Sequence, residues 1–242
     1  MIVIPMAGLS SRFFNAGFTQ PKYMLEAQGD TLFAHAVKSF AHYFEQEPFL
    51  FIIRDVFGTK AFIEKEVDRL GIKQAQIVTL EDETRGQAET VYLGLQALAA
   101  EDGPITIFNI DTFRPGFTFP ENIAQWDGYL EVFEGSGDNW SFARPEHSNS
   151  TKVVETAEKN PISNLCSTGL YYFARTSDFL DAYRQELARP VDTWAKGELY
   201  IAPLYNQLIA DKLNIHYHLI DRQDVIFCGV PDEYYHFAKG TK

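Results

Sequence analysis

The chain has 242 residues and 45% hydrophobic content, which is enough for a sizeable core within one elaborated α/β domain. Its 21 lysines and arginines stand against 33 aspartates and glutamates, and the formal net charge of −12 argues against nucleic acid or an anionic membrane as a partner. Cys166 and Cys228 lack metal-site spacing and are expected as buried, reduced thiols, and with no basic leader or long apolar run the protein is expected to be soluble and cytoplasmic.

The first 25 residues combine a predicted strand with a predicted anion-binding loop. The run Ile-Val-Ile at residues 2–4 is β-branched and continuous, which is typical of a strand buried on both faces of a parallel sheet. Residues 7–12 follow as a loop whose backbone N–H groups can cradle phosphate oxygens, and Arg12 and Lys22 add two positive charges there. The simpler alternative is an ordinary strand-to-helix turn with two solvated charges.

Strands and helices then alternate along the chain. Thr31 is a suitable N-cap for an amphipathic helix. A strand is predicted over residues 49–53, a helix over 60–70 and a strand over 75–80. This alternation predicts a parallel sheet whose ligands lie beyond the carboxyl ends of its strands.

Asp111 follows a fourth predicted strand. The segment over residues 84–90 opens another helix, and the apolar residues 105–110 form a buried strand. A carboxylate at the end of a central strand is costly unless it is solvated or bound to a cation, and a hard cation such as Mg²⁺ prefers oxygen ligands. Asp111 is therefore the predicted metal ligand, and an aspartate that starts a turn is the alternative.

The second half of the chain is less regular. Residues 126–133, 140–143 and 152–154 alternate apolar and polar side chains, and residues 135–139 predict a hairpin between the first two segments. Further along, we expect a strand over 167–173, a helix over 176–187, a helix that opens at Gly197 and continues to Asp211, and strands over 215–220 and 225–228.

The loop and the lysine together resemble a known signature. Gly8 to Arg12, followed by Pro21-Lys22 and Leu25, is similar to the Gly-x-Gly-Ser/Thr-Arg and Pro-Lys motifs of the sugar-phosphate nucleotidylyltransferases. The resemblance is to members of the glucose-1-phosphate thymidylyltransferase type that serve capsular and surface polysaccharides. Ser10 stands where the family has its second glycine, which restricts the backbone there. The resemblance covers nearly the whole chain, through residues 86–88, 109–111, 155–161, 167–173 and 229–233.

The resemblance implies both a fold and a reaction. The fold is a Rossmann-like, mixed and mostly parallel α/β sheet with helices on both faces, of the nucleotide-diphospho-sugar transferase or GT-A-like class, with a small antiparallel sugar-side lobe. It implies a single nucleotidyltransferase domain over residues 1–242, with a nucleotide-binding half to about residue 112 and an acceptor-side half after it. The implied reaction joins a nucleoside triphosphate to a sugar 1-phosphate or a related phosphorylated small molecule, with Mg²⁺ as cofactor.

The family's functional residues match defined positions of this chain. The implied catalytic residues are Arg12, Lys22 and Asp111, and Asp111 is also the implied metal ligand. The implied nucleotide-binding residues are Ala7, Gly8, Leu9, Ser10, Ser11 and Gln87. The implied acceptor-binding residues are Asn109, Glu158, Lys159, Gly169 and Glu198. For Glu198, contact with a substrate hydroxyl and favourable placement at a helix N-terminus are equally open.

The chemistry of the implied reaction explains why the chain needs no catalytic base. The attacking phosphate has a second pKa near ~6, so it is largely a dianion at neutral pH. Catalysis then reduces to positioning and charge neutralisation, with Arg12 on the leaving pyrophosphate and Lys22 at the α-phosphorus. The expected partners are the triphosphate and the phosphorylated acceptor, and the resemblance leaves room for a homo-oligomer.

Two other functions are consistent with parts of the sequence. A glycosyltransferase of similar fold also places an acidic metal ligand after a central strand, and a non-catalytic nucleotide-binding regulator would keep the loop but not need Lys22 and Asp111. Phe227 occupies the position where many relatives carry a second metal-binding aspartate, so either Asp111 acts alone or Asp224 or Asp232 replaces that ligand. The nucleobase, whether of dTTP, UTP, CTP or GTP, and the acceptor are left open.

Overall fold

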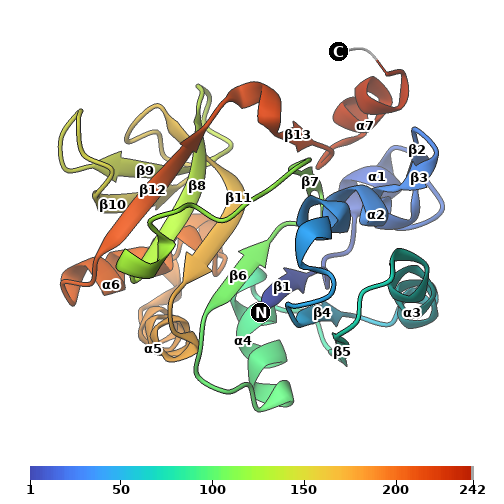
Figure 1. The fold of residues 1–242 in the computed structure, drawn as a ribbon, viewed down its shortest axis with the longest axis horizontal. Coiled ribbons are helices and arrows are strands. Elements are labelled where there is room, and N and C mark those ends of the chain that lie inside the picture. The colour runs from blue at the N-terminus through green and yellow to red at the C-terminus, as the bar shows by residue number, and fades with distance from the viewer. Residues whose placement is uncertain (241–242) are drawn as a thin grey trace. The chain divides into compact units, whose positions relative to one another are not determined.

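The structure, a computed structural model that describes residues 1–240, contains the mixed α/β sheet predicted from the sequence (Figure 1). The chain divides into two compact units. The first contains Met1–Val3, Thr84–Phe108 and Phe119–Arg222, and the second contains Ile4–Glu83, Asn109–Thr118 and the residues from Gln223 onward. Strand β1 (Ile2–Pro5) contributes residues to both units.

The sheet of the first unit is centred on strand β11. Besides part of β1, its strands are β6 (Ile105–Phe108), β8 (Gly128–Glu134), β9 (Ser141–Pro145), β10 (Val153–Glu158), β11 (Leu165–Phe173) and β12 (Ile215–Ile220). They lie in the order β10-β9-β11-β6-β1, and β8 pairs with both β11 and β12. β1 is parallel to β6 and β8 to β12, whereas β11 is antiparallel to β6, β8 and β9. All nine residues of β11 are buried, as its central place requires.

The hairpin predicted across residues 135–139 is wrong. β8 pairs with β11 and β12, and β9 pairs with β10 and β11. β8 is buried at every position from Gly128 to Phe133, which is the pattern of a strand inside a sheet. Because strands occupy both of its edges, no edge is left for the segment that follows it in the sequence.

Helices α4 (Gln87–Leu98) and α5 (Thr176–Leu187) of the first unit agree with the predicted helices. The N–H group of Ser177 in the first turn of α5 donates to Asp102 Oδ1 at 2.9 Å. This contact satisfies one of the backbone donors that every helix N-terminus leaves without an intrahelical acceptor. Within residues 1–240, no helix has the length and apolar character needed to cross a bilayer.

The helix predicted to open at Gly197 begins later than expected. Glu198 is extended, with φ −122° and ψ 156°, and helix α6 spans only Tyr205–Ala210 after a 3₁₀ turn over Ala202–Leu204. Pro203 explains the delay, because proline has no backbone N–H to donate inside a helix and is tolerated only in the first turn, which is where it lies here. The interpretation of Glu198 as a helix N-terminal charge is therefore wrong.

The second unit surrounds a pair of parallel strands. Its elements are α1 (Ser11–Asn15), η1 (Lys22–Met24), β2 (Glu26–Ala27), β3 (Asp30–Thr31), α2 (Leu32–Val37), η2 (Lys38–Tyr43), β4 (Phe49–Ile53), α3 (Thr59–Leu70), β5 (Ala75–Thr79), β7 (Thr112–Phe113), β13 (Ile226–Phe227) and α7 (Pro231–Ala238). β4 is fully buried and pairs with β5, and Met6 N–H donates to Ile52 O of β4 at 2.8 Å. Thr31 caps α2 as predicted, accepting from Ala34 N–H at 3.1 Å.

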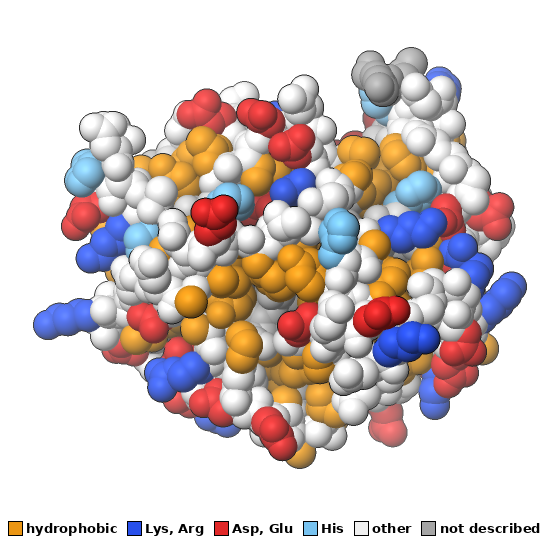
Figure 2. Space-filling view, viewed as in Figure 1, with side chains coloured by type: hydrophobic (Ala, Val, Ile, Leu, Met, Phe, Trp, Pro, Cys, Tyr) orange, Lys and Arg blue, Asp and Glu red, His pale blue; other side chains and the backbone are white. Residues whose placement is uncertain are grey.

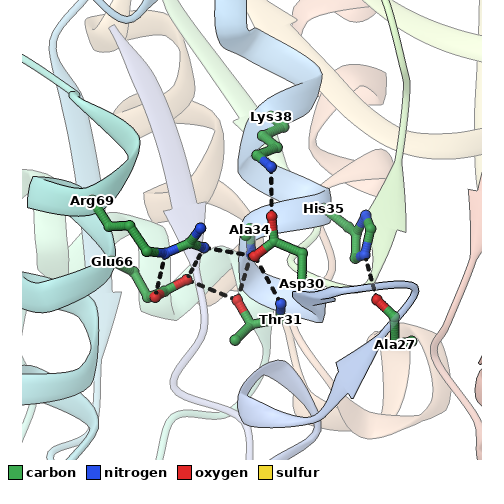
Figure 3. A network of polar contacts seen from close by, with 8 residues as sticks. All are labelled: Ala27, Asp30, Thr31, Ala34, His35, Lys38, Glu66 and Arg69. Atoms are coloured by element: carbon green, nitrogen blue, oxygen red, sulfur yellow. Dashed lines mark hydrogen bonds and ion pairs between the residues drawn. The ribbon is translucent and has the colours of Figure 1, made fainter.

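Charged side chains fix the turn between β2 and β3 (Figure 3). Asp30 accepts from Lys38 Nζ through Oδ2 at 2.5 Å and from Arg69 Nη2 through Oδ1 at 2.6 Å. Arg69 also donates to both carboxylate oxygens of Glu66, at 2.9 and 2.7 Å. Thr31 Oγ1 completes the network by donating to Glu66 Oε2 at 2.8 Å. The network therefore ties helices α2 and α3 to the hairpin that directly follows η1.

The pKa values of the two carboxylates in this network are lowered. Burial raises the pKa of Asp30, but hydrogen bonds from Lys38, Arg69 and the Thr31 N–H outweigh it. For Glu66, the hydrogen bonds from Arg69 are the largest cause and outweigh the opposing effect of burial on the pKa. Because both pKa values are lower in the folded state, the stabilisation is present above the ordinary carboxyl range near about pH 4 and is lost as the pH falls through the lowered values.

Replacement of Asp30 by asparagine should therefore destabilise the protein in a pH-dependent way. We expect the free energy of unfolding at pH 7 to fall by roughly 1–3 kcal/mol, because two charge-assisted hydrogen bonds weaken. The difference from wild type should shrink as the pH falls through the lowered pKa of Asp30, because Asp30 itself then becomes protonated. Urea denaturation of both proteins across this pH range measures the effect, with Asp68→Asn on the exposed side of α3 as the control. An equal loss at every pH would contradict the assignment.

Candidate active site

Acidic and basic side chains are interspersed over the face of the molecule drawn in Figure 2. A broad positive surface is not seen on this face, in keeping with the net charge of −12. With this net charge, binding of a phosphate relies on individually placed cations.

The predicted phosphate-binding loop leads from β1 into α1 in the second unit. Ala7 is buried, Ser10 is half-buried, and Gly8 and Leu9 are exposed. Ser11 and Arg12, the first residues of α1, are exposed as well. The loop therefore presents backbone and side chains to solvent along most of its length.

Ser10, at the position where the resemblance places a glycine, adopts a left-handed backbone conformation. Its φ of 53° and ψ of 29° lie in the left-handed region, which costs a non-glycine residue free energy. Its hydroxyl offers a compensating contact, because Ser10 Oγ accepts a hydrogen bond from Lys22 N–H at 3.2 Å. The serine thus ties the loop to the start of η1, and glycine could not do so because it has no side chain.

Lys22 and Asp111, which lie 89 positions apart in the sequence, meet in the second unit. Lys22 Nζ donates to Asp111 Oδ2 at 2.5 Å. Their side chains are 18% and 26% exposed, so the pair is held by the protein yet open to solvent. The next residue, Tyr23, is buried and hydrogen-bonds Thr59 Oγ1 through its hydroxyl at 2.8 Å, which anchors η1 to α3. The sequence predicts both charges, and the structure shows that they form one ion pair.

A second carboxylate, Glu233 from α7, lies beside Asp111. Glu233 Oε2 accepts from the N–H groups of Gly229 and Val230 at 2.8 and 3.2 Å. A Cβ on Gly229 would lie 3.2 Å from Asp111 Oδ2 and 3.6 Å from Glu233 Oε2, so both carboxylates approach the same point. Burial, together with the charges of Glu233 and Asp111, raises the pKa of the neighbouring Cys228 thiol to about 12. That thiol stays protonated and unreactive.

The carboxylate oxygens of Asp111 and Glu233 suit Mg²⁺ better than a transition metal. Within residues 1–240, no group of three or more His, Cys, Asp or Glu side chains is arranged to hold a metal ion. Mg²⁺ keeps several waters and is often held by one or two carboxylates together with substrate phosphates, so Asp111 with Glu233 nearby fits its requirements. Asp224 and Asp232 are exposed, and Phe227 pairs with Thr112 between β13 and β7.

In the first unit, the predicted acceptor-binding residues Glu158, Lys159 and Glu198 form a charged cluster. Burial, together with the charge of Glu198, raises the pKa of Glu158, and the Ser141 hydroxyl and Lys159 oppose this. Ser141 Oγ donates to Glu158 Oε2, and Lys159 Nζ donates to the hydroxyl of Tyr200. The cluster thus offers carboxylates for sugar hydroxyls and an ammonium group for a phosphate.

The remaining predicted residues are distributed over both units. Gly169 lies in β11 with φ 90°, at the register shift between β11 and β8, and only glycine adopts this conformation without strain. Gln87 is the first residue of α4 and is half-buried. Asn109 belongs to the second unit, with Asp111, and its carbonyl accepts from Thr112 N–H at 3.3 Å.

Comparison with known proteins identifies the family. The crystal structure of the nucleoside-diphosphate-sugar pyrophosphorylase from Vibrio cholerae RC9 is 65% identical to this chain, covers 99% of this chain and 100% of its own, and has a TM-score of 0.96. This chain belongs to the nucleoside-diphosphate-sugar pyrophosphorylase family. No family model matches the sequence, and no curated protein matches it.

Two more distant structures share the fold. The inositol-1-phosphate CTP transferase from T. maritima has 15% identity and a TM-score of 0.72, over 98% of this chain and 94% of its own. A UTP-bound UGPase from Acinetobacter baumannii has 15% identity and a TM-score of 0.71, over 99% of this chain and 92% of its own. At this level of identity, the similarity describes the fold.

Two residues of the candidate site were not predicted from the sequence. Glu233 has a local signal, because a glutamate three residues after Val230, with Pro231 between them, is the pattern of a helix N-terminus. That pattern predicts a capping contact and says nothing about Asp111. Tyr200 has no such signal, since its contact with Lys159 joins residues 41 positions apart.

Proposed function

We propose that this family member transfers a nucleotidyl group from a nucleoside triphosphate to the phosphate of a sugar 1-phosphate and releases pyrophosphate. The observation that carries the proposal is the pair of Lys22 and Asp111, which places a cation and a carboxylate at 2.5 Å in the unit that also holds the loop ending in Arg12. A cation for phosphoryl oxygens and a carboxylate for a hard metal ion are the two groups that this transfer needs.

The proposed roles in the second unit follow from charge. Lys22 stabilises the negative charge that grows around the α-phosphorus, and Arg12 neutralises the departing pyrophosphate. The loop residues Ala7, Gly8, Leu9, Ser10 and Ser11 bind the triphosphate through backbone and hydroxyl groups. Asp111, with Glu233 beside it, would hold Mg²⁺, which when bound neutralises phosphate charge.

The proposed roles in the first unit concern recognition. Gln87 reads the base edge through an amide that both donates and accepts. Lys159 holds the acceptor's phosphate, and Glu158 and Glu198 bind its hydroxyl groups. The acceptor phosphate is already largely ionised near neutral pH, so these residues bind and orient it and remove no proton.

The direct test crosses a panel of triphosphates (dTTP, UTP, CTP and GTP) with sugar 1-phosphates and other small phosphate monoesters, with Mg²⁺ present. We expect pyrophosphate release that requires both substrates, together with an NDP-linked product. Release of nucleoside diphosphate from a nucleotide sugar, with no pyrophosphate in any combination, would instead indicate glycosyl transfer. Tight triphosphate binding without turnover in any combination would indicate a regulatory protein. The best pair from this panel identifies the base and the acceptor.

Gln87→Ala should weaken base discrimination more than it slows the reaction. An amide that reads a base edge binds the ground state and the transition state alike, so KM for the preferred triphosphate should rise by roughly tenfold while kcat changes little. Steady-state kinetics with all four triphosphates measure this, and Gln96→Ala, on the exposed side of the same helix, is the control. A loss confined to kcat, with the order of triphosphate preference unchanged, would contradict the role.

A further inference from the structure

Two backbone hydrogen bonds in the first unit join the segment with the proposed base-reading residue to a segment on the acceptor side. Leu199 N–H donates to Arg85 O at 2.9 Å, and Leu199 O accepts from Ala88 N–H at 2.9 Å. Gln87 lies between Arg85 and Ala88, and Glu198 directly precedes Leu199. The backbone of Leu199 therefore joins the two segments.

Gly86 allows this close approach. Its φ is 149°, and a Cβ placed on it would lie 2.4 Å from Leu199 O, 2.6 Å from Leu199 N and 2.8 Å from Leu199 C. Van der Waals contact requires well over 3 Å, and all three atoms belong to the backbone, so no side-chain rotation relieves the overlap. Any residue larger than glycine must push the two segments apart.

Side chains hold the Arg85 end of the contact in place. Glu89 Oε2 accepts from Arg85 N–H, and Glu89 Oε1 accepts from Arg85 Nε at 2.9 Å and from Nη2. Tyr183 donates its hydroxyl to the same oxygen at 3.2 Å, and the Arg85 guanidinium lies 5.8 Å from the ring centroid of Trp194. Glu89 is buried, whereas the Arg85 side chain is 52% exposed, so the carboxylate is shielded from solvent and its hydrogen bonds with Arg85 hold the geometry of the pair.

On the acceptor side, Tyr200 extends the contact to Lys159. The Tyr200 hydroxyl accepts a hydrogen bond from Lys159 Nζ, which also lies 4.5 Å from the centroid of the Tyr200 ring. A lysine side chain is flexible, so a hydroxyl and a ring that both contact its ammonium group reduce the number of positions it can take. Hydrogen bonds and covalent bonds thus connect Gln87 to Lys159 through Leu199 and Tyr200 without a break.

We propose that Gly86 and Tyr200 are positioning residues that couple the two substrates, so that a bound triphosphate raises the affinity for the acceptor phosphate. The inference rests on the proposed function of Gln87 and Lys159. A ligand that orders one segment reduces the conformational entropy that the other segment loses when its own ligand binds. The coupling is reciprocal, so the acceptor raises the affinity for the triphosphate by the same factor.

The test measures binding without turnover. The acceptor is titrated calorimetrically into protein with and without a non-hydrolysable analogue of the preferred triphosphate, in the presence of Mg²⁺. For wild type we expect the analogue to tighten acceptor binding by roughly fivefold or more. For Gly86→Ala we expect this factor to fall towards one. Gly103→Ala is the matched control, because among the described residues no atom approaches an added Cβ there within 4 Å.

Tyr200→Phe provides a second variant that does not depend on how the fold tolerates Gly86→Ala. It removes the hydroxyl that holds Lys159 and keeps the ring. We expect weaker acceptor binding and a smaller coupling factor, with unchanged affinity for the analogue alone. A merely structural role would lower the melting temperature and leave the coupling factor intact.

The outcomes separate this inference from the proposed function. An absence of coupling in wild type, or a wild-type factor in either variant, would overturn the inference even if the enzyme makes nucleotide sugars normally. Failure of wild type to release pyrophosphate with any substrate pair would instead overturn the proposed function.

Discussion

Replacement of Lys22 by alanine should reduce kcat by roughly a hundredfold or more, because it removes a preorganised cation from the site of charge development. Arg12→Ala should have a comparable effect through the leaving pyrophosphate. The fold should remain intact, since Arg12 is exposed and the Lys22–Asp111 pair is open to solvent. Such a pair contributes about 1 kcal/mol or less to stability, which shifts the melting temperature of a chain of this size by about 4 °C or less.

Pyrophosphate release at saturating substrates, followed beside thermal melting, checks this result. Lys65→Ala is the matched control, because Lys65 is exposed on α3 of the same unit, outside the proposed site. Turnover by Lys22→Ala at a rate near that of wild type would show that the lysine does not act at the α-phosphorus. A large drop in melting temperature would point to a structural role instead.

Replacement of Asp111 by alanine should also abolish turnover, by roughly a hundredfold or more, because it removes the proposed protein ligand of Mg²⁺. Asp224→Ala and Asp232→Ala are the matched controls and should keep most of the activity, since both carboxylates are exposed. Binding of Mg²⁺ to the complex with a non-hydrolysable triphosphate should weaken in Asp111→Ala alone of these three variants. Inactivity of Asp224→Ala together with normal activity of Asp111→Ala would contradict the assignment.

The role of Asp111 can also be measured without turnover, because Asp111 forms an ion pair with Lys22. Lys22 Nζ lies 2.5 Å from Asp111 Oδ2, so in the nucleotide-free protein the lysine competes with a metal ion for the same oxygen. Wild type should therefore bind Mg²⁺ weakly without nucleotide, and Lys22→Ala should bind it more tightly. Calorimetric titration of Mg²⁺ into both nucleotide-free proteins measures the difference. Tight Mg²⁺ binding by nucleotide-free wild type that disappears in Asp224→Ala would show that Asp224 is a second protein ligand of the metal ion.

The local elements of this protein followed from its sequence because short-range physics determines them. A continuous β-branched run forms β1, Thr31 caps α2 through its own hydroxyl, and the helix predicted over residues 176–187 is present with those bounds. Each of these features depends on residues within a few positions of one another. The mixed α/β sheet likewise followed from the alternation of strands and helices in the first half of the chain.

The pairing of strands was decided only in the tertiary structure. β8 and β9 are neighbours in sequence with a turn-forming segment between them, yet β11 pairs with both of them. β8 and β11 bury more apolar surface inside the sheet than a local hairpin of β8 with β9 would bury. The sequence pattern shows that a segment is a strand, and it does not show which edge the segment will occupy.

For the candidate site too, the sequence determined one part and the tertiary structure decided the other. The sequence by itself determined which residue types are available: the loop with Arg12, the lysine at position 22 and the carboxylate at position 111. Only the tertiary structure brought Glu233 beside Asp111, and only it brought Tyr200 to Lys159 and Leu199 to Gly86. Such contacts join residues tens of positions or more apart, and they arise because the packed core fixes each segment's place, which no local pattern encodes.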